Sequence, residues 1–177
     1  MKSQNKSQLW AVFTTFIAIL IIFSTITFIF RKSLTDPGRP PGIDTRSFTH
    51  TAKVIADYFN SHSKIPAIDP YWYNDFEINY VPPLIYPPII LVYWLTGNSD
   101  YAGSVIYYLI ALMTAFGMFY LLKKESGTFN AIIGSFMWAL SPLIFIESRS
   151  RILAVAFLPL AFYFVNQILE KKKSQKL

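Results

Sequence analysis

The sequence predicts an all-α polytopic membrane protein with about four transmembrane helices and a large extracytoplasmic first loop that carries surface helices. Three observations support this prediction. The chain of 177 residues is 53% hydrophobic and only 15% charged. In soluble domains, roughly a quarter of all residues are charged. Four stretches of 18 to 22 residues contain no charge, at residues 9–30, 102–122, 128–146 and 152–169. Lysines stand directly at the ends of these stretches, where topology-determining charges belong.

The chain divides into four parts. Residues 1–30 form a cytoplasmic N-terminus and the first transmembrane helix, which is longer than a signal-peptide core and is followed by no small-residue cleavage site. Residues 31–100 form the extracytoplasmic loop, and residues 101–170 hold three further transmembrane helices. Residues 171–177 form a basic cytoplasmic tail. Each apolar stretch approaches or exceeds the roughly 20 residues that cross a bilayer as a helix.

A fifth apolar segment, residues 82–97, decides on which side of the membrane each loop lies. If it does not cross, eight lysines lie inside and the outer short loop holds only Arg149 and Arg151; if it crosses, four basic residues stay inside and six lie outside. The positive-inside rule therefore favours the first arrangement. Proline disfavours regular helix, and four prolines stand in the first half of the segment, Pro82, Pro83, Pro87 and Pro88. We expect the segment to dip into the interface or pack against other helices, with a short kinked fifth span as the alternative.

The loop is expected to contain a short amphipathic helix at the membrane surface. Phe48, Ala52, Ile55 and Phe59 recur at helical spacing and form one apolar stripe. Ser47 is a natural N-cap, and residues 60–66 are expected to end the helix.

Asp44 and His50 flank the start of this helix. A carboxylate in such a place can orient a metal, act as a base or bind a sugar hydroxyl. The alternative is that Asp44 only caps a turn or favours the helix dipole. As a metal signal the pair is weak, because hard divalent ions need more oxygen ligands.

Two further groups of residues are candidates for binding. The segment after the helix joins aromatic side chains to acids, which suits sugar recognition; the aromatics equally suit a bilayer interface. Its candidates are Trp72, Tyr73, Asp75 and Glu77. In the outer loop, the guanidinium groups of Arg149 and Arg151 are planar forks that can grip a phosphate. Contact with lipid headgroups is the alternative for both arginines.

Several short motifs resemble the start of GT-C fold glycosyltransferases. These motifs are "GID" with Asp44, "YVPPLIYPPIILVYWLTGN" and "ALSPLIFIESRSR". The chain also resembles a group of prokaryotic membrane proteins catalogued as 6-pyruvoyl-tetrahydropterin synthase-related. The shared pattern there is an acid, a histidine and then "SKIPAIDPYWYNDFEINY", followed by Pro82 and Pro83.

The resemblance implies transfer of a sugar from a polyprenyl-phosphate-linked donor on the extracytoplasmic side. Asp44 would be the catalytic residue, Arg149 and Arg151 would hold the lipid phosphate, and His50 with the aromatic and acidic segment would line the sugar site. The family includes metal-independent members, so the resemblance implies no certain cofactor and leaves a divalent metal open. Membrane lipid is a further expected partner, and nucleic acid is not, because the basic residues lie at the span ends.

Two departures from the family pattern bear on this expectation. No acid follows the arginines in "SRSRILAV", and the full GT-C fold has more spans than this chain. We therefore expect an N-terminal module, which is a fragment of a longer protein, a truncated gene product, or one part of a split protein that a C-terminal partner chain completes. The alternative function is a non-catalytic small membrane subunit or scaffold of a cell-envelope complex.

Overall fold

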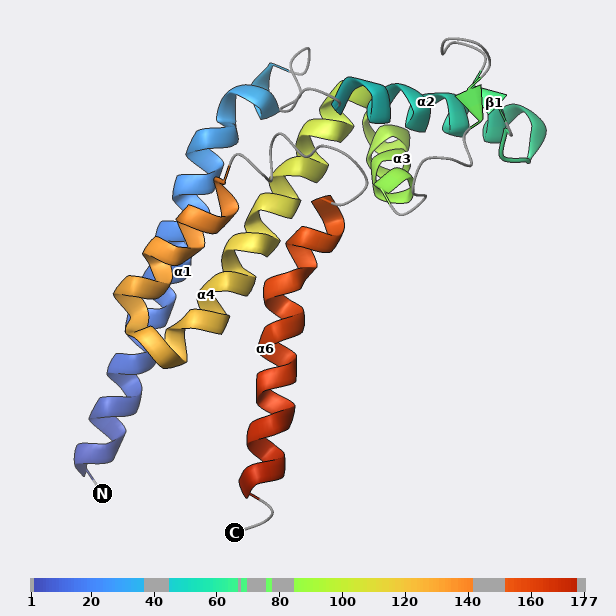
Figure 1. Cartoon of the computed structure of the whole chain (residues 1–177). Coiled ribbons are helices and arrows are strands. Elements are labelled where there is room, and N and C mark those ends of the chain that lie inside the picture. Colours follow the sequence, from blue (N-terminus) through green and yellow to red (C-terminus); the bar gives the residue numbers. More distant parts are fainter. Residues whose placement is uncertain are drawn as a thin grey trace. The chain divides into compact units, whose positions relative to one another are not determined.

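The part of the chain that the structure describes forms five helices and one short antiparallel strand pair (Figure 1). The structure is a computed structural model that describes residues 2–36, 45–66, 68–69, 76–77, 85–141 and 152–174. Its elements are α1 (Lys2–Thr35), α2 (Thr45–His62), β1 (Ile68–Asp69), β2 (Phe76–Glu77), α3 (Tyr86–Thr96), α4 (Ser99–Ala139) and α6 (Ile152–Ser174). The predicted all-α class is confirmed. By length and composition, α1 and α4 could each cross a membrane.

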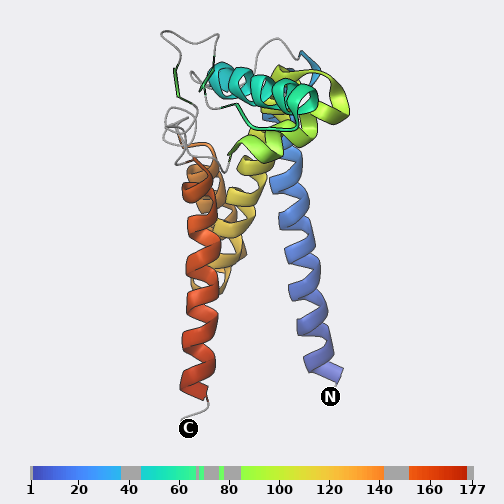
Figure 2. The same cartoon turned by 90° about the vertical axis from the view of Figure 1, so that its right-hand side faces the viewer.

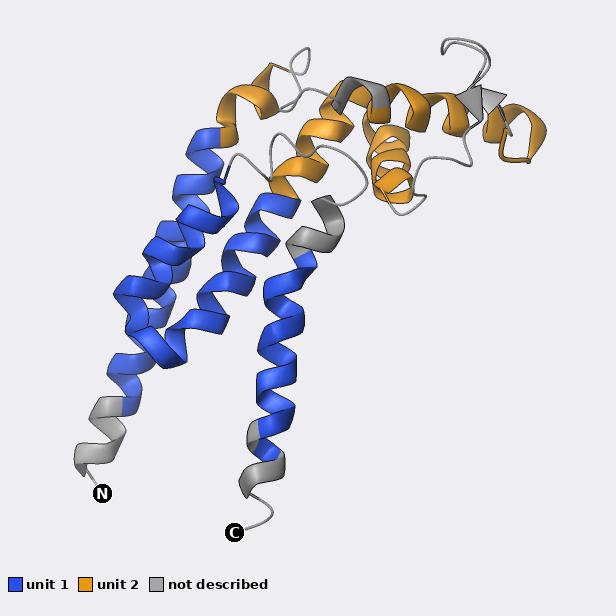
Figure 3. Ribbon diagram, viewed as in Figure 1, with its two compact units in different colours: residues 1–29, 110–141, 154–177 blue, residues 30–109, 142–153 orange. Residues whose placement is uncertain are grey.

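The helices belong to two compact units, each assembled from segments that are distant in sequence (Figure 3). Unit 1 comprises residues 1–29, 110–141 and 154–177, and unit 2 comprises residues 30–109 and 142–153. Unit 1 therefore holds most of the apolar helical length, and unit 2 holds α2, α3 and the strand pair.

One face of α1 is buried and the rest is open. Ala18, Ile22 and Ile26 recur every fourth residue and are at most 1% exposed, so they form a seam along one side of the helix. Only 17% of the most apolar 18-residue window of α1 is buried. The apolar surface of this helix thus greatly exceeds what its neighbours in the described chain cover.

The long helix α4 reverses direction at Gly127. The backbone there has φ 77° and ψ 169°, a conformation essentially reserved for glycine. Beyond the break, Gly134 lies so close to Leu122 that an added Cβ would collide with the leucine side chain. Residues 99–126 and 128–139 are therefore two arms of a hairpin, and the chain turns at "KKESG", residues 123–127, between the uncharged stretches 102–122 and 128–146.

The first arm of α4 contacts both other apolar helices within unit 1. The ammonium of Lys123 donates a hydrogen bond to Oγ1 of Thr15 on α1. Towards α6, a Cβ on Gly117 would lie 3.0 Å from Cγ of Leu160, and the rings of Tyr120 and Tyr163 lie 6.1 Å apart. The close approach at Gly117 is typical of helix pairs with a small residue at the contact.

The predicted amphipathic helix is present as α2. Phe48, Ala52 and Ile55 are buried, whereas Phe59 is 43% exposed and meets the ring of Trp94 on α3. The helix ends at His62, within the predicted range. The prediction of Ser47 as N-cap is wrong, because α2 begins at Thr45 and Ser47 lies in its first turn.

The proline-led segment forms the short helix α3, which lies beside α2 in both views (Figures 1 and 2). The prediction that its prolines all block helix is wrong for Pro87 and Pro88, which stand in the first turn. Their missing N–H groups have no helical acceptor there anyway. Gly97 ends α3 at φ 70°. With 11 residues, α3 is about 16 Å long, roughly half of a bilayer core.

Candidate functional site

The predicted site residues fall mostly outside the described part of the chain. Of the eight, the structure describes the side chain of His50, which lies exposed on the first turns of α2. Glu77 pairs through its backbone with Ile68 in the strand pair. The remaining six lie outside the described residues, namely Asp44, Trp72, Tyr73, Asp75, Arg149 and Arg151.

A polar cavity lies where the start of α2 faces the start of α4 in unit 2. It has a volume of about 450 Å³ and is lined by Thr49, His50, Ser99 and Asp100. Oγ1 of Thr49 donates a hydrogen bond to Oδ1 of Asp100 over 3.2 Å. Thr49 is only 1% exposed, while His50 is exposed. The lining thus combines a buried hydroxyl that is bonded to Asp100 with an exposed histidine.

Asp100 lines this cavity although α4 does not need it as a cap. Asn98 caps the helix instead, since its Oδ1 accepts from the backbone N–H of Tyr101 over 3.0 Å and its carbonyl accepts from Ala102. An N-cap side chain satisfies the otherwise unpaired first-turn donors. The carboxylate of Asp100 is consequently directed to Thr49 on α2.

Sequence reasoning identified His50 but missed Thr49, Ser99 and Asp100. The helix-start pattern "NSD" at residues 98–100 was a usable signal for the beginning of α4. It does not distinguish a capping acid from one that faces a cavity. The pairing of Thr49 with Asp100, 51 residues apart, is a tertiary contact that helical periodicity does not reveal.

A second polar cluster joins α2 to α3. Lys53 and Asp57 form an ion pair one turn apart on α2, and the hydroxyl of Tyr93 on α3 donates to the other carboxylate oxygen of Asp57 over 2.9 Å. The ammonium of Lys53 lies 5.9 Å from the centre of the Tyr93 ring. Asp57 is therefore the acceptor that connects the two helices.

This cluster shifts the pKa values of its three members. The hydrogen bond to Asp57 raises the pKa of the Lys53 ammonium. Burial raises the pKa of the Asp57 carboxyl, but the hydrogen bonds from Lys53 and Tyr93 and the positive charge of Lys53 together lower it more, so this pKa lies below its ordinary value. Burial and the bond to Asp57 both raise the pKa of the Tyr93 phenol. The folded state therefore favours ionised Asp57 beside neutral Tyr93.

We expect the contact between α2 and α3 to weaken in acid. A carboxyl with a lowered folded pKa stabilises the fold above its unfolded pKa of about 3.9 and loses this contribution as the pH falls through the folded value. Hydrogen exchange of the α3 amides, corrected for intrinsic rates, should therefore accelerate below about pH 4. In Asp57→Asn this acid step should be absent.

The variant Tyr93→Phe isolates the same contact at neutral pH. Deleting the hydroxyl should accelerate exchange of the α3 amides roughly threefold to tenfold, the effect of one hydrogen bond. Tyr58→Phe is the matched control on α2, because its ring stacks on His62 and the stack survives loss of the hydroxyl. Equal exchange in both variants would contradict a connecting role for Asp57.

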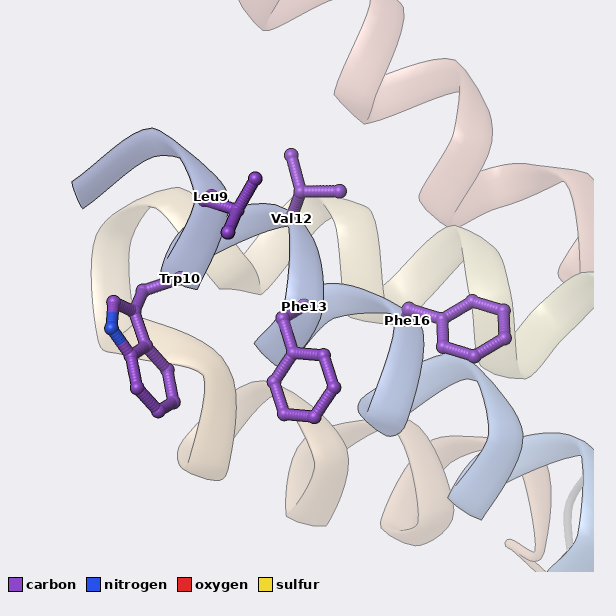
Figure 4. Close-up of a pocket in the computed structure, with 5 residues that line it drawn as sticks. All are labelled: Leu9, Trp10, Val12, Phe13 and Phe16. Carbon is purple, nitrogen blue, oxygen red and sulfur yellow. The ribbon is translucent and has the colours of Figure 1, made fainter. Parts of the chain in front are cut away.

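The outer face of α1 carries an apolar hollow of about 460 Å³. Figure 4 shows the five side chains that line it, all of which come from α1: Leu9, Trp10, Val12, Phe13 and Phe16. Each is more than half exposed. No polar side chain lines this hollow among the described residues, so it offers no chemistry beyond apolar contact.

The described residues contain no group of three or more histidine or acidic side chains that could hold a metal ion. The polar cavity contains a single carboxylate, that of Asp100, and it is the candidate site that we consider further. Comparisons of the chain with protein-family models, with curated proteins and with solved structures found no match.

Proposed function

We propose that the chain is a multi-pass membrane protein of glycosyltransferase type, which transfers a sugar from a polyprenyl-phosphate-linked donor on the extracytoplasmic side. It spans the membrane four times, with both ends in the cytoplasm. The residues of the GT-C resemblance act on the outer side, together with the polar cavity of unit 2.

The exposed apolar surface of α1 supports membrane insertion. Leu9, Phe16 and Phe28 are each more than half exposed, spread over a helix with 22 consecutive uncharged residues. Burial of such side chains is worth about 1.5–3 kcal/mol each. Water would leave this contribution unrealised, whereas the hydrocarbon of a bilayer satisfies it along the whole helix.

The hydrogen bond from Lys123 to Thr15 supports the proposed assignment of loops to the two sides of the membrane. Thr15 lies in the N-terminal half of α1, and Lys123 lies near the C-terminal end of the first α4 arm. Near the other ends of the same two helices, the rings of Phe30 on α1 and Tyr108 on α4 lie 5.9 Å apart. With these two contacts the helices run antiparallel, and the "KKESG" turn lies at the same end as the N-terminus. This arrangement agrees with four spans and basic residues inside; a crossing by residues 82–97 would place the turn at the opposite end.

With four spans and the N-terminus inside, residues 31–100 lie on the outer side, and these residues include the lining of the polar cavity. The α2–α3 pair lies at the membrane surface on this side, with α3 too short to span. In the proposed reaction Asp44 is the general base for the acceptor hydroxyl, and Arg149 and Arg151 hold the lipid phosphate.

Sugar transfer by the full chain tests this proposal. The chain, with its C-terminal partner if one is encoded beside it, is given a radiolabelled polyprenyl-phosphate-hexose donor in membranes. Asp44→Asn should lower the transfer rate by at least 100-fold, the effect of removing a general base. Asp36→Asn is the control, an acid eight residues earlier in the same loop. Full activity of Asp44→Asn would end this assignment.

The outer face of α1 favours one alternative, a non-catalytic subunit of an envelope complex. The hollow formed by Trp10, Phe13 and their neighbours (Figure 4) would then receive a helix of a partner instead of lipid. A subunit of this kind predicts full function in Asp44→Asn and loss of function when the aromatic loop residues Trp72 and Tyr73 are replaced.

A further inference from the structure

We propose that the cavity between the starts of α2 and α4 is a binding site for a neutral, hydroxyl-rich ligand, a hexopyranose ring, with Asp100 as its principal hydroxyl acceptor. The inference rests on the proposed function for the class of ligand. It adds to that function a sugar-binding residue, Asp100, that the chain's family resemblance does not include.

The carboxylate of Asp100 is held in place by one hydrogen bond and has further acceptor positions. A carboxylate has two oxygens and about four acceptor positions, and the bond from Thr49 occupies one of them. The helix start is already capped by Asn98, so the acid is not required for that purpose. Thr49, nearly inaccessible to solvent, fixes Oδ1 and leaves the remaining acceptor positions for donors in the cavity.

The four lining side chains select a neutral ligand with hydroxyl groups. An anion would meet the charge of Asp100 at close range. A hard divalent cation needs six or more oxygen ligands, and the cavity offers one carboxylate and two hydroxyls. Sugar hydroxyls both donate and accept, so they match the carboxylate of Asp100 and the hydroxyl of Ser99.

The size and position of the cavity also suit a sugar ring. Its volume of about 450 Å³ lies within the roughly 300–1,000 Å³ of small-molecule sites. One of its lining residues, His50, is exposed, so the cavity is in contact with the surface of the protein.

Photolabelling of the full chain in phosphatidylcholine–phosphatidylglycerol nanodiscs tests the site. The probe is a hexopyranoside with a diazirine on the aglycone, and the control probe carries the same diazirine on a cyclohexyl ring. We expect the sugar probe to label peptides from the starts of α2 and α4. Free methyl hexopyranoside should suppress this labelling, and the cyclohexyl probe should not produce it.

Variants separate the role of Asp100 from general damage. Asp100→Asn should reduce labelling about tenfold or more, because a charge-assisted hydrogen bond is lost. Thr49→Val should reduce labelling and Thr49→Ser should retain it, since only serine keeps the hydroxyl. Glu125→Gln, which removes an exposed acid in the α4 turn, is the charge control. Unchanged labelling in Asp100→Asn, or an equal loss in Glu125→Gln, would overturn the inference.

The labelling experiment and the sugar-transfer assay can fail independently of each other. Labelling at the cavity without any sugar transfer would contradict the proposed reaction and support the binding site. Sugar transfer that depends on Asp44, combined with labelling elsewhere in the chain, would support the reaction and contradict this binding site.

Discussion

Replacing Leu20 by aspartate should reduce insertion of α1 into the membrane by about 3–4 kcal/mol, because aspartate at the centre of a spanning helix costs about 2.5–3.5 kcal/mol and leucine contributes favourably. Leu20 is the appropriate position because it lies at the middle of residues 9–30 and is 43% exposed. Carbonate extraction and glycosylation mapping of the first helix measure the inserted fraction.

If the chain were a soluble protein, Leu20→Asp should have almost no effect on its stability. An exposed side chain that faces water tolerates replacement within about 0.5 kcal/mol, so Leu20→Asp would be almost silent. Leu9→Asp is the matched control, since Leu9 is 74% exposed but stands at the end of the apolar stretch, where a charge reaches the headgroups. Equal insertion of the Leu20 and Leu9 variants would contradict a transmembrane α1.

The helices could be predicted from the sequence where one residue type dominates locally. The stripe of Phe48, Ala52 and Ile55 predicted α2 because burial follows the helical period. Phe59 belongs to the same stripe but is exposed, since its surroundings depend on where Trp94 of α3 lies. Periodicity identifies the face of a helix, and the neighbours decide how far along that face burial extends.

Element boundaries and polar contacts were harder to predict, for two physical reasons. Proline disfavours a helix in its interior but is well tolerated in its first turn, so Pro87 and Pro88 were compatible with either outcome until the helix start was known. The contacts of Asp100 with Thr49 and of Asp57 with Tyr93 join residues 51 and 36 positions apart. Such pairs depend on how α2 is placed against α3 and α4, which no local pattern specifies.

The second prediction concerns the contact between α4 and α6. Gly117→Leu should destabilise unit 1 by about 1–3 kcal/mol, the usual cost of overpacking a close contact. A Cβ at this position would lie 3.0 Å from Cγ of Leu160 and 3.4 Å from its backbone nitrogen. The side chain of Leu160 can turn away, but the backbone of α6 cannot without separating the helices. Chemical denaturation of the chain in detergent micelles measures the loss.

Helix propensity alone predicts that Gly117→Leu stabilises the protein, so the sign of the measured change distinguishes a close contact from an open one. Leucine in a helix interior is favoured over glycine by up to about 1 kcal/mol, so an open contact would make Gly117→Leu stabilising. Gly117→Ala should lie near neutrality, because its gain in propensity offsets a tight contact with a flexible side chain. Adding Leu160→Ala to Gly117→Leu should recover part of the loss, giving a coupling energy that only neighbouring residues produce. A stabilised Gly117→Leu variant, or strict additivity in the double variant, would show that α6 does not pack on α4 at this position.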